Sequence, residues 1–421
     1  MVLLAPPQDA SISSYTPALK QYYLDIVPEN ETYKKRPWFA LVPKIVTFEG
    51  LNSPLPLMYS NPQGVSASFS SALAAQEPTQ LAAFTLTRAP KYGFATLQGE
   101  AYLAARSNVG SFVSSFATEI DNTFLEMTQD IHFDMYGDGS GIRSNIAFLA
   151  GLVITLSNPT DVRKFSVGMS LEIAPAPTGA SRVGPAYIVA INRSTGTITL
   201  SALPAGTVVG DGIYRLGSRG PSTNLQGLAA WLPMGGPIAA PFFGVSRQVD
   251  SGRLAGIWLD ARGSSVFDAL ITLATQIDVN GGTPDYAFMH PIKYAELVKQ
   301  LGNQVLYENV IMEEYGNIGF KAVVVQTDFG EIRVISDSMA TPISSNQWSD
   351  AGPTAYAGAY PIYMLQLDSW YMMSLDTAPH IIQDDGLFVI RAATEDAIQV
   401  RLRFLGNLGC RAPGYNGVAV V

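Results

Sequence analysis

The sequence predicts an α+β protein built from several unequal parts, and three observations lead to this fold class. One long segment has an apolar repeat of three and four residues, which is typical of an amphipathic helix. Short strand-like segments separated by Gly and Pro lie on both sides of it. The second half of the chain mixes helices and strands. With 421 residues, 47% of them apolar, the chain can form two or three domains at roughly 100–200 residues each.

The first 105 residues are predicted to form two extended pieces. Residues 1–40 mix Pro and Tyr with clustered charge and are expected to form an N-terminal arm with one short helix near residues 17–24. Residues 41–105 are expected to form an extended β-hairpin loop, with strands at residues 44–48 and 81–87. Neither piece has enough apolar mass for a core of its own, so each must pack on other elements or other chains.

The clearest helix lies in residues 106–143. Its apolar stripe consists of Val109, Phe112, Val113, Phe116, Ile120, Phe124, Met127 and Ile131. Ser107 and Asn108 are suitable caps at its start, and Gly137 is a suitable stop. About 25 residues at 1.5 Å each make a rod of roughly 37 Å. We therefore expect this helix to lie along a sheet as a structural backbone.

Residues 144–217 are predicted to form an inserted small β domain, either a barrel or a sandwich. The segments 188–191 and 197–200 flank a turn that contains Gly196, which is a hairpin signal. Further strands are expected at residues 167–173 and 213–216. Loops on both sides indicate that this domain is an insertion.

Residues 218–421 are predicted to be mixed α and β. The expected elements are a helix at 264–277 behind a Ser cap, a strand at 286–289, a helix from Pro291 to Gly302, a hairpin of 320–326 with 331–335, and a period-two strand at 398–404. No internal repeat is visible.

The charge composition argues against a protein that binds nucleic acid tightly. Only 14% of the residues are charged, against roughly 25% in an average soluble protein. The net charge is −9, whereas neutralising phosphates requires a basic surface. The cations are mostly Arg, which protein interfaces favour over Lys. A surface this poor in charge favours burial against partners.

Other features of the sequence bear on compartment. The single cysteine, Cys410, cannot form an internal disulfide, which suits a reducing compartment. No signal peptide is visible, and the longest charge-free apolar stretch, residues 146–156, is shorter than the ~20 residues that span a bilayer. We expect a soluble protein that is made in the cytoplasm and does not span a membrane.

The sequence offers no convincing catalytic, cofactor-binding or metal site. His132, His290 and His380 are far apart and belong to no metal-binding pattern, so capping or packing is expected for each. Residues 328–330 match the kinase tripeptide but lack its catalytic-loop partner and are expected to form a turn. Residues 134–141 lack the ligands of a calcium loop and are expected to end the long helix. Cys410 is expected to be unreactive and partly buried.

In this order the pieces resemble the major capsid proteins of tailed bacteriophages, the Hong Kong 97-like fold family. The segments that carry the resemblance are 69–72 and 92–100, which resemble strands of the family's extended loop, 136–141 after the long helix, 285–297, 328–334 and 405–421. His290 departs from the family pattern, where Asn is more usual. Each motif alone is weak, and their order carries the specificity.

The resemblance implies a shell subunit without enzymatic activity. Its expected parts are an N-terminal arm (1–40), an extended β-hairpin loop (41–105), a spine helix with the Gly-rich loop of the peripheral domain (106–143), the inserted β domain (144–217), and the peripheral and axial domains (218–421). Inter-subunit contacts are expected at Lys34, Lys35, Arg36, Phe69, Phe84, Arg88, Lys91 and Tyr92. The inserted domain is expected to face outward, because a wall tolerates insertions on a free face.

The resemblance also implies partners and a place in the virion. Many copies would form pentamers and hexamers of an icosahedral head that is assembled in the host cytoplasm and encloses double-stranded DNA without sequence-specific binding. The charged helical scaffold segment of many family members is not seen here, so a separate scaffolding protein is expected, together with a portal and a possible decoration protein. A Lys–Asn crosslink of the family would have Lys44 or Lys91 as its lysine, without an identified Asn.

Three alternatives stay open at this stage. A tail-tube or adhesin subunit is one structural option, although the spine helix would be unusual there. A cellular nanocompartment shell has the same fold, although its members are more compact and the 144–217 insertion favours a virus. A β-rich hydrolase could use a pair of Asp or Glu side chains, but no such pair stands out on one predicted element.

Overall fold

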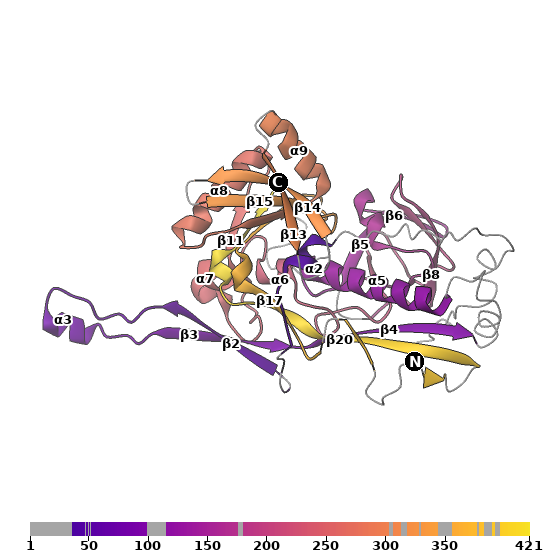
Figure 1. Cartoon of the computed structure of the whole chain (residues 1–421), viewed down its shortest axis with the longest axis horizontal. Helices are drawn as coiled ribbons and strands as arrows, with labels where there is room; N and C mark the ends of the chain where they lie inside the picture. Colours follow the sequence, from indigo (N-terminus) through magenta and orange to yellow (C-terminus); the bar gives the residue numbers. More distant parts are fainter. Residues whose placement is uncertain are drawn as a thin grey trace.

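We describe a computed structural model of the chain, which has four parts (Figure 1). The described residues are 36–46, 48, 50, 52–98, 115–175, 180–302, 306–312, 318–327, 330–343, 356–376, 379–382, 390–391 and 396–421. A long hairpin extends away from the body on one side. On the other side, a barrel and a long helix lie above a sheet, and a second, mixed sheet completes the body.

The first sheet is built around one 14-residue strand, β20 (Ala397–Cys410). Strand β4 (Ala89–Gln98) pairs along one stretch of it, and three shorter strands also pair with it. These are β17 (Trp370–Ser374), β18 (His380–Ile381) and β19 (Ile390–Arg391), with β1 (Lys44–Ile45) parallel to β17. Side chains alternate across β20, so that Val400, Leu402 and Phe404 are buried, whereas Arg401 and Arg403 on the other face are half-buried.

Helix α5 (Ser115–Tyr136) lies along this sheet and contacts β4. Its apolar face includes Met127 and Ile131, both buried in the largest core cluster. The helix ends where Gly137 donates a backbone hydrogen bond to the carbonyl of Asp134. A short helix, α2 (Pro37–Leu41), packs nearby and contributes Trp38 to the same core.

Six strands between Ile142 and Arg215 close into an antiparallel barrel. They are β5 (Ile142–Ala150), β6 (Val153–Leu156), β7 (Ser170–Ala174), β8 (Ala186–Asn192), β9 (Thr197–Leu200) and β10 (Gly212–Arg215), with the 3-10 helix η1 (Pro159–Lys164) between β6 and β7. The interior holds its own aliphatic cluster, which includes Ile154, Ile173 and Ile198. The barrel therefore has a core separate from that of the body.

The second sheet has seven strands of mixed direction. In spatial order these are β11 (Ile257–Asp260), β21 (Gly417–Val420), β16 (Pro361–Leu365), β12 (Tyr286–Met289), β15 (Gly330–Ser336), β14 (Ile318–Thr327) and β13 (Leu306–Met312). Helices α8 (Val266–Val279) and α9 (Pro291–Leu301) pack on one face. Alternation along β12 sends Ala287 and Met289 toward these helices and Phe288 into the central core.

The two sheets meet in a core of aromatic rings. Trp38 lies 5.2 Å from Phe288 and 5.8 Å from Trp370, measured between ring centroids. Trp231, in the short helix α6 (Leu228–Trp231), lies 6.3 Å from Trp370. Two further short helices, η2 (Arg247–Asp250) and α7 (Ser251–Ala255), lead into β11. Edge and tilted contacts of this kind stabilise a core beyond the area they bury.

Most predicted elements of the second half are present in the structure. The helix after Pro291 ends at Leu301 before Gly302, and His290 caps its start by accepting a hydrogen bond from the backbone N–H of Ile292. Strand 286–289, the β14–β15 hairpin and the long terminal strand are confirmed. The β8–β9 hairpin is also confirmed. The predicted caps Ser107 and Asn108, the arm helix and the turn residues 328–329 lie outside the described residues.

Two expectations for the hairpin region are wrong. Residues 69–72 do not form a strand but begin α3 (Phe69–Ala74), because Ser68 accepts a hydrogen bond from the backbone N–H of Ser71 and caps the turn. The projecting part is also shorter than residues 41–105, since β4 pairs with β20 in the body over ten residues. Among the described residues, no helix is both long and apolar enough to cross a membrane.

A buried asparagine joins the two sheets and provides a stability test. The Asn416 side-chain oxygen accepts hydrogen bonds from Gln366 N at 2.8 Å and Trp370 Nε1 at 2.7 Å, and its amide donates to Ser369 Oγ at 2.9 Å. Asn416→Ala leaves these partners unsatisfied, so we expect the free energy of unfolding to fall by about 3 kcal/mol. Urea denaturation measures this. Asn61→Ala, at an exposed position, should change it little, and equal losses in both variants would contradict the assignment.

Candidate assembly surface and ionic junction

The projecting hairpin, residues 52–87, is here called the finger. Its strands are β2 (Asn52–Ser60) and β3 (Gln80–Thr87), which pair in antiparallel register from Asn52 opposite Thr87 to Ser60 opposite Gln80. Helix α3 forms part of its tip. Nine residues of strand at about 3.4 Å each give a ladder of roughly 30 Å.

The base of the finger is anchored in the aromatic core. Phe84 is fully buried, and its ring lies 5.1 Å from that of Trp231 and 6.3 Å from that of Phe242. Leu55 and Leu86 are buried beside it. Near the end of β2, Arg253 donates a hydrogen bond to the carbonyl of Tyr59. The finger is therefore held rigidly where it leaves the body.

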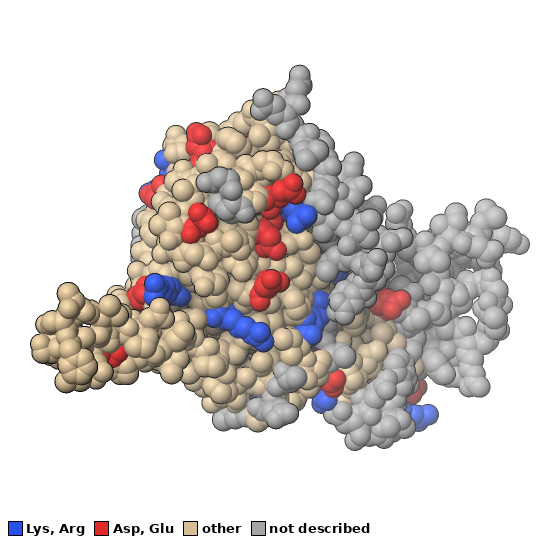
Figure 2. All heavy atoms as spheres, turned by 60° about the vertical axis from the view of Figure 1, so that its left-hand side comes forward, with Lys and Arg blue, Asp and Glu red and all other residues tan. Residues whose placement is uncertain are grey.

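The outer part of the finger exposes apolar side chains and almost no charge. Val65 is 96% exposed and Phe69 is 85% exposed. Met58, Leu73 and Leu81 are each more than half exposed. Glu77 is the only charged residue between Asn52 and Thr87, and Figure 2 shows the finger almost entirely in the colour of uncharged residues. Such a surface is costly in water and is suited to burial against another protein surface.

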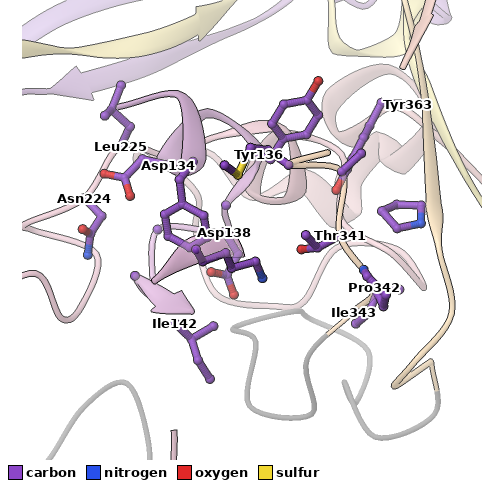
Figure 3. A pocket seen from close by; sticks show the side chains of 18 of the residues that line it. Asp134, Tyr136, Asp138, Ile142, Asn224, Leu225, Thr341, Pro342, Ile343 and Tyr363 are labelled. Atoms are coloured by element: carbon purple, nitrogen blue, oxygen red, sulfur yellow. The ribbon is translucent and has the colours of Figure 1, made fainter. Parts of the chain in front are cut away.

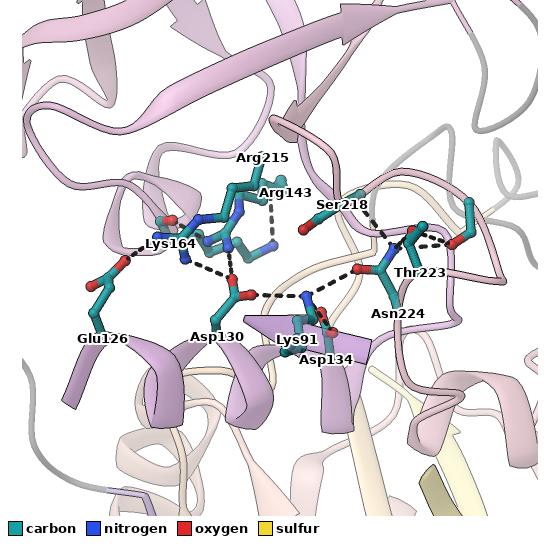
Figure 4. Close-up of polar contacts among 11 residues, drawn as sticks. Lys91, Glu126, Asp130, Asp134, Arg143, Lys164, Arg215, Ser218, Thr223 and Asn224 are labelled. Atoms are coloured by element: carbon teal, nitrogen blue, oxygen red, sulfur yellow. Dashed lines mark hydrogen bonds and ion pairs between the residues drawn. The ribbon is translucent and has the colours of Figure 1, made fainter. Parts of the chain in front are cut away.

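A second candidate site is a buried group of charges, here called the ionic junction (Figure 4). It consists of Glu126, Asp130 and Asp134 on α5, Lys91 on β4, Arg143, Lys164 and Arg215 of the barrel, and Asn224. The three acidic residues are spaced by four, so they lie on one face of the helix. The junction thus connects three parts of the chain: the strand that follows the finger, the long helix and the barrel.

Lys91 and Asp130 lie at its centre. The Lys91 ammonium is 2.8 Å from Asp130 Oδ2 and 2.8 Å from Asp134 Oδ2, and it donates to Asn224 Oδ1 at 3.1 Å. Asp130 is also paired with Arg143 and with Arg215, whose Nη1 is 3.1 Å from Asp130 Oδ1. Asn224 is held by its own hydrogen bonds to the carbonyls of Ser218 and Gly220.

On the barrel side, η1 and β5 complete the network. Lys164 donates to the carbonyl of Arg143 at 2.9 Å and lies 2.7 Å from Asp161 Oδ1. The Phe133 ring on α5 faces both cations, with the Arg143 guanidinium 4.8 Å from its centroid. Cation–π contacts of this kind add to the ionic attraction.

The two central carboxylates differ in their protonation. Although burial opposes it, the charges of Lys91, Arg215 and Arg143 hold the pKa of Asp130 below its ordinary value. Burial raises the pKa of Asp134 to about 6, with the negative charge of Asp130 acting in the same direction and Lys91 against it. The pKa of Lys91 is raised by the two carboxylates despite its burial. Lys91 and Asp130 are therefore ionised over the whole physiological range.

A small cavity lies next to the junction at the end of α5 (Figure 3). Its volume is about 30 Å³, and its lining includes Tyr136, Asp138, Thr341 and Tyr363. This is room for one or two water molecules rather than a substrate. Asp138 Oδ1 accepts a hydrogen bond from the backbone N–H of Ser140 at 3.0 Å, which shapes the Gly-rich loop.

The other face of α5 carries a buried pair with the second sheet. His132 Nε2 is 3.0 Å from Asp337 Oδ2, and the Tyr136 hydroxyl donates to the same oxygen at 2.9 Å. Although burial opposes it, the His132 ring lowers the pKa of the Asp337 carboxyl. His132 is thus a packing residue, as expected. Its ring pairs with Asp337 across the face of the helix and does not cap the end of the helix.

The predicted inter-subunit residues separate into three groups. Lys34 and Lys35 lie outside the described residues. Phe69 and Tyr92 are exposed, while Arg36 and Arg88 are half-buried, so for these four the prediction stays untested. Arg36 donates to the carbonyl of Leu125 on α5, and the Arg88 guanidinium lies 5.5 Å from the Phe48 ring centroid.

For Phe84 and Lys91 the prediction is wrong. Phe84 is in the aromatic core, and Lys91 is only 7% exposed and saturated by the ionic junction. Neither side chain can reach a neighbouring copy. The ionic junction itself was missed, because its members are spread from residue 91 to residue 224. The i, i+4, i+8 spacing of Glu126, Asp130 and Asp134 was the one sequence signal that pointed to it.

The other residues considered as candidate site residues have structural contacts. Cys410 is buried, and burial raises the pKa of its thiol to about 12, which makes it unreactive. His380 lies 3.2 Å from Asp376. In the part of the chain that the structure describes, no three His, Cys, Asp or Glu side chains gather as metal ligands.

The junction leads to a stability prediction. Lys91→Met removes one cation and leaves two buried carboxylates facing each other, so we expect the free energy of unfolding to fall by about 3–5 kcal/mol. Lys293→Met breaks a partly exposed ion pair with Glu296 at the surface and should cost about 0–1 kcal/mol. Chemical denaturation of the purified variants measures both. Adding Asp134→Asn to Lys91→Met should restore part of the loss, and a loss that is simply additive would show that the two residues are not coupled.

Comparison with known proteins identifies the fold. No family model matches the chain, and no curated protein matches its sequence. Among solved structures, a chain of the Cyanophage A-1(L) capsid asymmetric unit aligns with a TM-score of 0.55 at 11% identity, covering 96% of this chain and 97% of that one.

Two other similar structures align over nearly the full length with lower scores. The SrpI encapsulin complex of Synechococcus elongatus has a TM-score of 0.48 at 8% identity, covering 97% of this chain and 94% of that one. A chain from Mycobacterium phage Ogopogo has a TM-score of 0.45 at 10% identity, covering 97% and 98%. The cyanophage alignment, with the mixed α and β architecture, shows that this chain has the Hong Kong 97-like fold of bacteriophage capsid proteins.

Proposed function

We propose that the chain is the major capsid protein of a tailed bacteriophage and self-assembles into the icosahedral shell that encloses double-stranded DNA. The observation that carries this proposal is the finger. It is anchored by buried aromatic packing at its base, yet beyond the base it exposes apolar side chains with a single charge. An isolated globular protein has no use for such a projection, whereas a second copy can cover it.

Assembly from many copies agrees with the composition. With 14% charged residues, much of the surface can be buried without removing ions from water. Each contact can be modest, because a closed symmetric shell repeats it many times. A net charge of −9 suits a container whose wall does not bind its DNA tightly.

The parts of the fold have proposed roles in this shell. Residues 1–40 serve as an arm and the finger, within residues 41–105, as the extended loop that lies on a neighbouring copy. Residues 106–143, with part of 218–421, form the peripheral domain, and the rest forms the axial domain around the five- and sixfold axes. The barrel, within residues 144–217, faces outward. A separate scaffolding protein, a portal and a decoration protein are the proposed partners, and the role is structural rather than enzymatic.

Shortening the finger tests the proposal. Replacing residues 59–80 with Asn-Gly joins Met58 to Leu81, which already pair across the ladder, by a two-residue hairpin turn. The buried Leu55, Phe84 and Leu86 of the base, β4 and the ionic junction stay in place, while the hydrogen bond of Arg253 to Tyr59 is lost. We expect a folded protein, with an unchanged circular dichroism spectrum, that no longer forms hollow particles in negative-stain images.

The full-length protein, alone or with its scaffolding protein, should form uniform hollow particles in the same images. As a matched control, Phe148→Ser and Val189→Ser remove exposed apolar side chains from the barrel and should leave assembly intact. Normal shells from the shortened variant would contradict the role of the finger. A full-length protein that stays monomeric at high concentration with the scaffold present would contradict the capsid function.

A further inference from the structure

The contacts of the barrel with α5 and β4 are mainly ionic. The barrel has its own apolar cluster, which contains no residue of the long helix or of β4. Its ionic contacts with them run through Arg143 and Arg215, which meet Asp130 and Glu126 on α5. Lys164 faces the Phe133 ring of the same helix. A joint that depends on charges with little shared core can open locally while both bodies stay folded.

Within the junction, the two central carboxylates are not compensated equally. Asp130 has three cationic partners: Lys91, Arg143 and Arg215. Asp134 is 3% exposed, and among the described residues its ion-pair partner is Lys91 alone. Lys91 already pairs with Asp130 at the same distance, so one ammonium serves two carboxylates one helical turn apart.

We propose that the ionic junction is a proton-linked joint, which binds one proton at Asp134 when the barrel, β4 and α5 are docked and is therefore held more tightly in mild acid than at neutral pH.

The charges around Asp134 from every element support this assignment. The charged residues of the junction are Lys91 from β4, Glu126 and Asp130 from the same helix as Asp134, Arg143 from β5, Lys164 and Asp161 from η1, and Arg215 from β10, with the Asn224 amide beside Lys91. Asp138, after the helix, lines the same cavity as Asp134. Four of these residues are basic and four are acidic. Protonating Asp134 leaves Asp130, the carboxylate shared by three cations, fully ionised. The network therefore keeps its main contacts when the proton binds.

The sign of the effect follows from the two states of Asp134. In the docked state its pKa is raised to about 6, whereas in an opened, solvated junction it returns to about 3.9. Between these values the docked state holds a proton that the opened state lacks, so lowering the pH shifts the equilibrium toward docking. Below about pH 4, Asp134 is protonated in both the docked and the opened state, so lowering the pH further no longer favours docking. In the same range, protonation of Asp130 in the opened state begins to oppose docking.

Hydrogen exchange of the full-length protein tests the proposal. Mass spectrometry at about pH 7.5 and about pH 5, corrected for the pH dependence of intrinsic exchange, gives the opening equilibrium of β4, β5 and β10. We expect about tenfold less opening at the lower pH, since each pH unit within the window is worth up to tenfold. Amides of α8, far from the junction along the chain, serve as an internal reference, and sedimentation confirms the same assembly state at both pH values.

Two variants complete the test. Asp134→Asn replaces the carboxyl with a permanently neutral group, so its junction should be as protected at about pH 7.5 as the unmodified protein is at about pH 5, with no pH dependence. Asp121→Asn, the same change at an exposed position of the same helix, should keep the pH dependence.

Pronounced loosening in acid, no change between the two pH values, or a pH dependence that persists in Asp134→Asn would each overturn the proposal. If Asp134→Asn does not fold, the comparison of the unmodified protein at the two pH values, against the α8 reference, still decides it.

Discussion

The arrangement of this protein depends on the charged and hydrogen-bonding side chains in the last turns of helix α5, which need partners from other parts of the chain. One face of the helix presents Glu126, Asp130 and Asp134 to the barrel and to β4. The opposite face presents His132 and Tyr136 to Asp337 at the end of β15. Three bodies are thus positioned against a single helix by charged and hydrogen-bonded contacts on two of its faces. The finger continues directly into β4, the strand that carries Lys91.

Burying so many charges costs free energy of desolvation, and the structure indicates that these charges fix the orientation of the parts they join. A well-packed apolar contact of the same size would be at least as stable. Apolar surfaces, however, can slide over one another, whereas paired charges with fixed hydrogen bonds define one orientation. The carboxylates are also unsuited to hydrolytic chemistry, which needs an acid and a base on either side of an accessible bond. Asp130 and Asp134 instead face Lys and Arg side chains, and the adjacent cavity is large enough only for water.

Local patterns in the sequence were sufficient to predict most of the elements. Apolar spacing and end signals located the helix after Pro291, the strand at 286–289 and the alternation along β20, because those elements follow from neighbouring residues. The helical tip of the finger was missed because a six-residue helix with a Ser cap has too few apolar positions to show a period.

The ionic junction could not be predicted, because its members become neighbours only when the barrel docks. Lys91 shows the limit most clearly. In the sequence it is one of two lysines in a loop region, and an exposed contact residue is the reasonable expectation for it. Only the pairing of β4 with β20, and of α5 with both, turns its side chain inward. Phe84 was misassigned for the same reason, since only the folded core places Trp231 beside it.

The distribution of charge links the two sites. The chain has few charged residues, and several of them lie in the buried junction, including Arg143, Lys164 and Asp130. The finger, in contrast, has one charge along its whole length. Ions placed inside the subunit define its shape, and surfaces without ions can be buried against other copies without a desolvation penalty for charge. A subunit built this way separates the interactions that fix its own geometry from those available for assembly.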